Sequence, residues 1–158
     1  MYLDGLYEFR ISKYDKNYTK SAPLIDQWTS ISDVGKLFGD QILTWDEYEK
    51  AEKRYLQLIH QVCSTLNISQ LQVTFLEDPF GECPYPNNSF LDGIDQVVEI
   101  SKDCLRERYW CKLQSDCLFF HFGYDYYLYV GSHLNQQQLS SLASSVGLFI
   151  ERKRSPYN

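Results

Sequence analysis

Two residues whose side chains can pair for catalysis, His121 and Asp125, lie in the stretch HFGYDYYLYVGS at 121–132. A carboxylate that orients a histidine serves general-base catalysis only when the two side chains are within hydrogen-bonding distance. On an unbroken strand the two residues, four positions apart, are separated by about 13 Å, so the pair would require the chain to reverse at Gly123. Large apolar residues at the even positions of 120–130 favour an unbroken strand. We therefore expect no catalytic pair here.

A metal site is the second chemical possibility, because Cys111, Cys117 and His121 are ligand types that zinc accepts. None of the five cysteines forms a CxxC pair, and their odd number favours free, buried thiols in a reducing compartment.

The carboxylates Glu77 and Asp78 would serve a glycosidase only with a partner about 5–9.5 Å away across a cleft. The chain also lacks the GxSxG, HExxH, P-loop and glycine-rich dinucleotide motifs. The sequence thus predicts no enzyme, no metal ion and no cofactor.

The charge and the aromatic content of the chain indicate what kind of partner it meets. A net charge of −6 argues against nonspecific binding of nucleic acid, which requires a basic surface. Thirteen tyrosines and nine phenylalanines suit a protein that contacts other proteins. No basic segment precedes an apolar run at the start, and no stretch approaches the roughly 18 apolar residues of a membrane span. We expect a cytoplasmic protein that contacts neither nucleic acid nor membrane and has a basic protein partner.

Four segments are predicted to be helices, and the two longest have the apolar spacing of amphipathic helices. The clearest is 45–66, which Thr44 precedes and in which Glu47 completes a capping box. A second long helix is predicted over 94–108, and two short ones are predicted over 32–37, capped by Ser32, and over 135–145.

The remaining apolar segments alternate as strands do, and the strands predicted from them are 6–12, 71–76, 109–114, 117–131 and 147–152. Strands and helices together predict an α/β (α+β) fold in a single domain, 1–158. Its sheet of about five strands should be antiparallel or mixed. Two long helices and one or two short ones should accompany the sheet, followed by a basic tail at 152–158.

The stretch 77–93 is the best candidate for a binding surface. It holds three of the five prolines, two glycines and four acidic residues, so we expect an irregular loop of a length that is usually functional. No lysine or arginine occurs across 77–101. Aromatic side chains in and near this loop, and on the exposed side of the 117–131 strand, would supply anchors. The predicted partner-binding residues are Glu77, Asp78, Phe80, Glu82, Tyr85, Asp92, Asp95, Tyr127 and Tyr129.

Six stretches carry a resemblance to a known family: YEFRISKYD (7–15), WTSISDVGKLF (28–38), ILTWDEYEKAEKRY (42–55), LRERYWCKL (105–113), FFHFGYDYYLYVGS (119–132) and GLFIERKRSPY (147–157). They resemble small bacterial proteins encoded beside secreted polymorphic toxins of the Rhs or contact-dependent-inhibition type, which are taken to be immunity proteins. The resemblance covers most of the chain except the loop 77–93. It implies a protein that binds one cognate toxin C-terminal domain and blocks it, and it carries over no catalytic residues.

Acidic composition is compatible with that implication, because toxins that cut nucleic acid present basic clefts. Specificity between cognate pairs needs elements that differ between relatives, which favours the loop 77–93 as the contact site. Two alternatives remain: an enzyme with a composite site around His121 and Asp125, and a cytosolic adaptor. Neighbouring genes would separate them, because an immunity protein should be encoded immediately downstream of a large secreted toxin.

Overall fold

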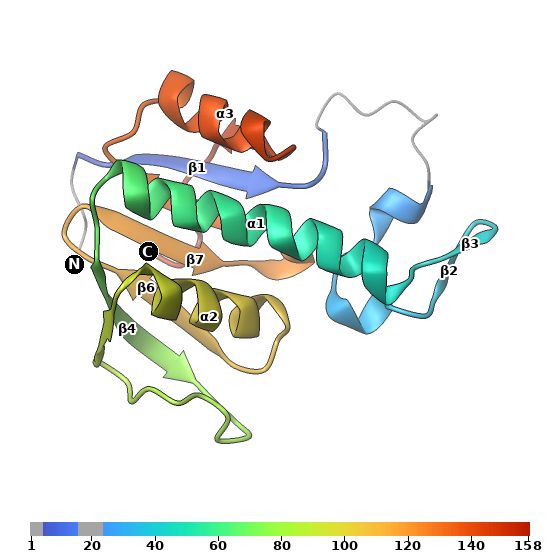
Figure 1. Cartoon of the computed structure of the whole chain (residues 1–158), viewed down its shortest axis with the longest axis horizontal. Coiled ribbons are helices and arrows are strands. Elements are labelled where there is room, and N and C mark those ends of the chain that lie inside the picture. Colours follow the sequence, from blue (N-terminus) through green and yellow to red (C-terminus); the bar gives the residue numbers. More distant parts are fainter. Residues whose placement is uncertain (1–4, 16–23) are drawn as a thin grey trace.

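The computed structural model describes residues 5–15 and 24–158 (Figure 1). The largest element in these residues is an antiparallel sheet. Seven strands in these residues follow the order β5-β4-β6-β7-β8-β1-β9, and every neighbouring pair is antiparallel. Their bounds are β1 Tyr7–Ser12, β4 Gln70–Glu77, β5 Phe90–Asp92, β6 Trp110–Gln114, β7 Leu118–Phe122, β8 Leu128–Ser132 and β9 Phe149–Arg152. The predicted α+β class is confirmed, whereas the estimate of about five strands is wrong.

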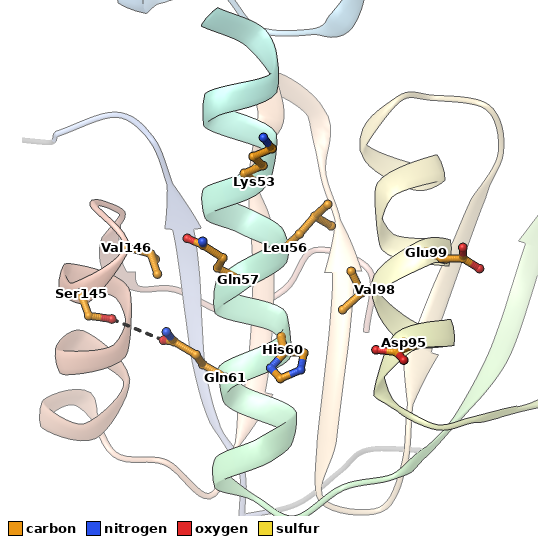
Figure 2. Close-up of a pocket in the computed structure, with 10 residues that line it drawn as sticks. All are labelled: Lys53, Leu56, Gln57, His60, Gln61, Asp95, Val98, Glu99, Ser145 and Val146. Carbon is orange, nitrogen blue, oxygen red and sulfur yellow. Dashed lines mark hydrogen bonds between the residues drawn. The ribbon is translucent and has the colours of Figure 1, made fainter. Parts of the chain in front are cut away.

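Three α-helices in the described residues lie side by side in front of the sheet, with α1 between α3 and α2 (Figures 1 and 2). Thr44 caps α1 as predicted, since its Oγ1 accepts the Glu47 N–H at 3.2 Å. The chain leaves α2 earlier than the predicted 94–108, because Arg106 is its C-cap. The bounds are α1 Trp45–Thr65, α2 Ile94–Leu105 and α3 Gln136–Ser145.

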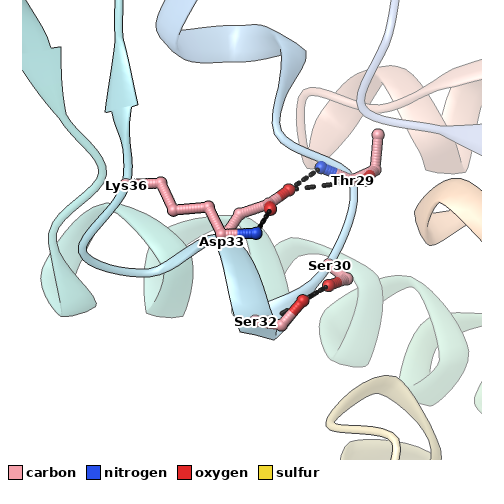
Figure 3. A network of polar contacts seen from close by, with 5 residues as sticks. All are labelled: Thr29, Ser30, Ser32, Asp33 and Lys36. Carbon is pink, nitrogen blue, oxygen red and sulfur yellow. Dashed lines mark hydrogen bonds and ion pairs between the residues drawn. The ribbon is translucent and has the colours of Figure 1, made fainter.

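The short helix predicted over 32–37 is wrong. Only Ile31–Asp33 form a 3-10 turn, which Ser30 caps with its side chain, and the chain then enters a small hairpin of β2 (Leu37–Phe38) and β3 (Gln41–Ile42). Figure 3 shows the polar contacts that replace the helix, among them the Lys36 ammonium at 3.1 Å from the Asp33 carboxylate. These contacts fix the segment that leads into α1.

The predicted single strand 117–131 is two strands. The chain reverses in a tight turn, in which the Gly123 N–H donates to the Tyr127 carbonyl at 2.8 Å and Asp125 and Tyr126 have φ of 58° and 62°. Even-numbered residues lie opposite even-numbered residues in the resulting hairpin, as in the pair Phe120 and Val130. One strand or two therefore give the same alternation of apolar residues, and the pattern alone cannot reveal the turn.

Several of the tyrosines form core rather than surface. Tyr48 and Tyr55 on α1 are fully buried, and Tyr126 in the β7–β8 turn is 5% exposed. The Tyr55 hydroxyl donates to the Tyr126 carbonyl at 2.8 Å, and the Tyr126 hydroxyl donates to the Tyr48 hydroxyl at 3.1 Å. Trp28 packs edge-on against Tyr126. Buried hydroxyls with partners cost little to bury, so this cluster secures the turn against α1.

An ion pair joins α1 to the end of α2. The Arg106 guanidinium donates from Nε and Nη2 to the two oxygens of Glu52, both at 2.8 Å, and lies 5.0 Å from the Trp45 ring centroid. Glu52 is 3% exposed. A carboxylate this buried requires its partner, because an unpaired charge there is strongly destabilising.

The face of the sheet opposite the helices carries the end of the chain. His121 and Phe119 alternate with the core residue Phe120, and so point to this face, where their rings stack at 4.2 Å. Ser155 lies over them, since its Oγ is 2.7 Å from His121 Nδ1 and its N–H donates to Glu8 at 2.8 Å. The predicted basic tail 152–158 is thus packed on the sheet at Ser155.

The turn that ends α2 contains a residue in an unfavourable backbone conformation. Glu107 has φ of 58°, and the N–H groups of Glu107 and Arg108 donate to Cys104 and Asp103 carbonyls as in a Schellman motif. Glycine is the usual residue at this position because a Cβ is crowded in left-handed backbone.

We predict that Glu107→Gly raises the free energy of unfolding by about 1 kcal/mol, because it removes this crowding. Glu99→Gly is the matched control: Glu99 is exposed within α2, where glycine should lower stability by about 1 kcal/mol. Urea unfolding followed by circular dichroism measures both. Equal destabilisation by the two substitutions would contradict the prediction.

Candidate partner-binding surface

The loop that joins β4 to β5 has a defined structure. The Asp78 carboxylate accepts the N–H groups of Glu82 and Cys83, both at 2.9 Å, and Asn87 Oδ1 accepts the Leu76 N–H at 3.1 Å. Asp78 is half-buried. Its oxygens are engaged by the loop backbone, so it shapes the surface rather than presenting charge to a partner.

The prediction of an irregular stretch over 77–93 is wrong at its end, where β5 pairs with β4 and aligns Leu91 with Leu71. Leu91 is fully buried, while its neighbours Phe90 and Asp92 are exposed. A three-residue strand of this kind carries little sequence signal. Its position makes it an edge of the seven-stranded sheet in the described residues.

Four large aromatic side chains are exposed on or near this side of the sheet: Phe75 by 63%, Phe80 by 76%, Phe90 by 59% and Tyr124 by 84%. The sequence singled out Phe80 among them. Phe75 shares the parity of the buried residues of β4, but a bulge gives it φ of 52° and turns it outward. No pattern in the sequence marks that bulge.

The predicted acidic residues fall into two groups. Glu77, Glu82, Asp92 and Asp95 are exposed, and within the described residues none of their carboxylates has a hydrogen bond or ion pair. No lysine or arginine occurs between Arg54 and Lys102 in the chain. We name these four acids, with Phe80 and Phe90, the acidic edge. Figure 1 shows the β4 to α2 segment that carries it at one side of the molecule.

The other predicted contact residues are less available. Tyr85 is half-buried in the loop. Tyr129 is 6% exposed, and Tyr127 lies beneath the Arg10 guanidinium, which is 4.1 Å from its ring centroid. Tyr127 precedes β8 and Tyr129 lies in it. Strands β6 and β7 lie between β8 and β4 in the sheet. The structure therefore does not bring Tyr127 and Tyr129 together with the acidic edge.

His121 and Asp125 do not form a pair. His121 is 2% exposed with its Nδ1 beside Ser155, and burial, with a smaller effect of the Lys112 charge, lowers its pKa to about 3. Asp125 is exposed in the turn. Cys111 lies 3.7 Å from Cys104 between the sulfur atoms, and the described residues contain no cluster of three potential metal ligands.

A groove of about 850 Å³ runs between the three helices (Figure 2). Lys53 and His60 of α1 line it together with Asp95 of α2 and Ser145 of α3, and a Ser145 to Gln61 hydrogen bond of 3.4 Å spans α3 and α1. Asp95 connects this groove to the acidic edge. Charges of both signs line the groove and partly cancel, so the groove attracts a charged partner less strongly than the acidic edge does.

Comparison of the chain with protein-family models, characterised proteins and solved structures gives no match. Among the described residues, no helix combines the length and apolar character needed to cross a membrane.

Proposed function

We propose that this protein is an immunity protein that binds a cognate bacterial toxin domain through the acidic edge. The observation that carries the proposal is the set of exposed carboxylates that have no partner in the described part of the chain, interleaved with exposed Phe80 and Phe90. Unpaired carboxylates speed encounter with a basic surface, and aromatic rings supply the buried anchors of an interface. A toxin domain with a basic cleft, such as a nuclease, fits this chemistry.

The rigidity of the loop supports the same proposal. The Asp78 carboxylate and Asn87 Oδ1 accept hydrogen bonds from the loop backbone, so the side chains of the loop are presented in a fixed arrangement. A surface that is ordered before binding loses less conformational entropy on association. The loop also coincides with the segment outside the family resemblance, as expected for residues that distinguish one toxin from another.

We predict that the double substitution Glu82→Lys and Asp92→Lys slows association with the toxin domain about tenfold or more at low salt, because steering charge is reversed. The partner to use is the C-terminal domain of the secreted protein encoded immediately upstream. Surface plasmon resonance at low and moderate salt measures the rate. Asp78 is left intact because its substitution would disturb the loop.

Asp40→Lys with Asp116→Lys is the matched control, since both acids are exposed in turns outside the acidic edge and the net charge changes equally. The control should associate at a rate much closer to the native one. If both double variants slow association equally, or neither does, the contact lies elsewhere. Survival of cells that co-express the toxin domain gives an independent readout of neutralisation.

A further inference from the structure

A second hollow lies where the start of β6, the β7–β8 turn and the end of the chain meet. It has a volume of about 400 Å³. Trp110, Tyr124 and Tyr157 are among the aromatic residues that line it, and Glu77 and Glu107 contribute carboxylates. The ring centroids of Trp110 and Tyr157 are 5.3 Å apart. We name these five residues the aromatic pocket.

The charge in this pocket is negative. Arg108 also lines it, but its guanidinium is 3.3 Å from the Asp103 carboxylate and is paired there. Lys112, on the neighbouring sheet face, donates to the Tyr157 carbonyl and lies 4.3 Å from the Phe75 ring centroid. The carboxylates of Glu77 and Glu107 have no hydrogen bond or ion pair within the described residues.

The walls of the pocket are presented by a constrained backbone. Tyr124 is 84% exposed in a turn whose next two residues, Asp125 and Tyr126, have left-handed backbone. Glu107 occupies a position that glycine would fill with less strain. Both side chains are exposed, so packing in the core does not place them, and both stand on or beside strained backbone.

We infer that the aromatic pocket receives an arginine side chain of the partner protein. Aromatic faces attract a cation, and a guanidinium in addition stacks on rings and donates to two carboxylates at once. A metal ion is a poorer occupant, since the described residues contain no cluster of three metal-ligating side chains. The inference rests on the proposed function and deepens it: Glu77 belongs to both surfaces, so the pocket adds an anchor at one end of the acidic edge.

The test uses N-acetyl-arginine methylamide as the probe and its uncharged citrulline counterpart as the control ligand. Titration into ¹⁵N-labelled protein should give saturable shifts at the amides of Glu107 and Tyr124 and at the Trp110 indole with the arginine probe. Glu77→Gln with Glu107→Gln should weaken the apparent affinity at least about fivefold, because the cation loses both carboxylates. Asp40→Asn with Asp116→Asn, which also removes two exposed carboxylates, should leave it unchanged.

Equal shifts with the citrulline ligand, or unchanged affinity in the Glu77→Gln, Glu107→Gln variant, would overturn the inference. A lysine probe that binds more tightly than the arginine probe would overturn the choice of guanidinium. The toxin domain separates this inference from the proposed function. Normal toxin binding by the same double variant would reject the pocket as an anchor and leave the immunity function standing, whereas probe binding without toxin binding would support the pocket and reject that function.

Discussion

Replacing Glu52 with leucine should lower the free energy of unfolding by about 3 kcal/mol or more, because the Arg106 guanidinium then loses the partner of a buried ion pair. Two contacts of 2.8 Å join the side chains, and Glu52 is 3% exposed. The aliphatic replacement fills similar volume, so the loss measures the stranded charge rather than a cavity. Urea unfolding monitored by circular dichroism gives the value.

Glu49→Leu is the control for Glu52→Leu. Glu49 is on the same helix and also approaches Arg106, but at 4.0 Å and with 37% of its side chain exposed. An exposed contact of this kind contributes about 1 kcal/mol at most. The double variant Glu52→Leu with Arg106→Leu should recover part of the lost stability, since no unpaired charge remains. If Glu49→Leu and Glu52→Leu lower the free energy of unfolding equally, the buried ion pair of Glu52 with Arg106 contributes no more than the exposed contact.

The helices were predictable because their signals are local. Thr44, the charged outer face and the apolar stripe of α1 all lie within one segment, and the structure begins the helix at Trp45 as predicted. The end of α2 was less predictable. Glycine usually marks a left-handed terminus, and this chain places Glu107 there instead.

The errors in the sheet concern relations between segments. The hairpin of β7 and β8 preserves the alternation of a single strand, and the signal for its turn was limited to Gly123, which reads equally well as a bulge. The outward turn of Phe75 likewise depends on a register shift between β4 and β6. Such shifts are set by the pairing of distant strands, which a single sequence does not specify.

The candidate site shows the same division. The acidic edge was predictable in composition, because exposed Glu77, Glu82 and Asp92 fall in one segment without basic residues. The structural role of Asp78 was not predictable, because the sequence does not show whether a carboxylate accepts backbone hydrogen bonds or is exposed to a partner. The aromatic pocket combines residues from β6, the β7–β8 turn and the end of the chain, so no window of the sequence contains it.

A buried histidine should make the stability of this protein depend on pH. His121 is surrounded by Phe119, Lys112, Tyr129, Tyr157 and Ser155, and its Nε2 has no hydrogen-bond partner among the residues that the structure describes. Burial chiefly, and the positive charge of Lys112 secondarily, lower its pKa from 6.5 to about 3. The folded protein thus holds the neutral imidazole in a range of pH where the unfolded chain binds a proton.

Because the unfolded state binds more protons between pH 6.5 and about 3, stability contributed by the neutral form is complete above pH 6.5 and is lost as pH falls through this window. As pH falls from about 6.5 to about 4.5, we expect His121 to lower the free energy of unfolding by about 2 kcal/mol. Other titrating groups add their own losses. His121→Asn keeps a polar atom near Ser155 but does not titrate, so the variant should lack this component. Urea unfolding of both proteins across the window isolates it as a difference. Parallel pH profiles would mean that the histidine titrates with its ordinary pKa, and hence that the end of the chain does not cover it in solution.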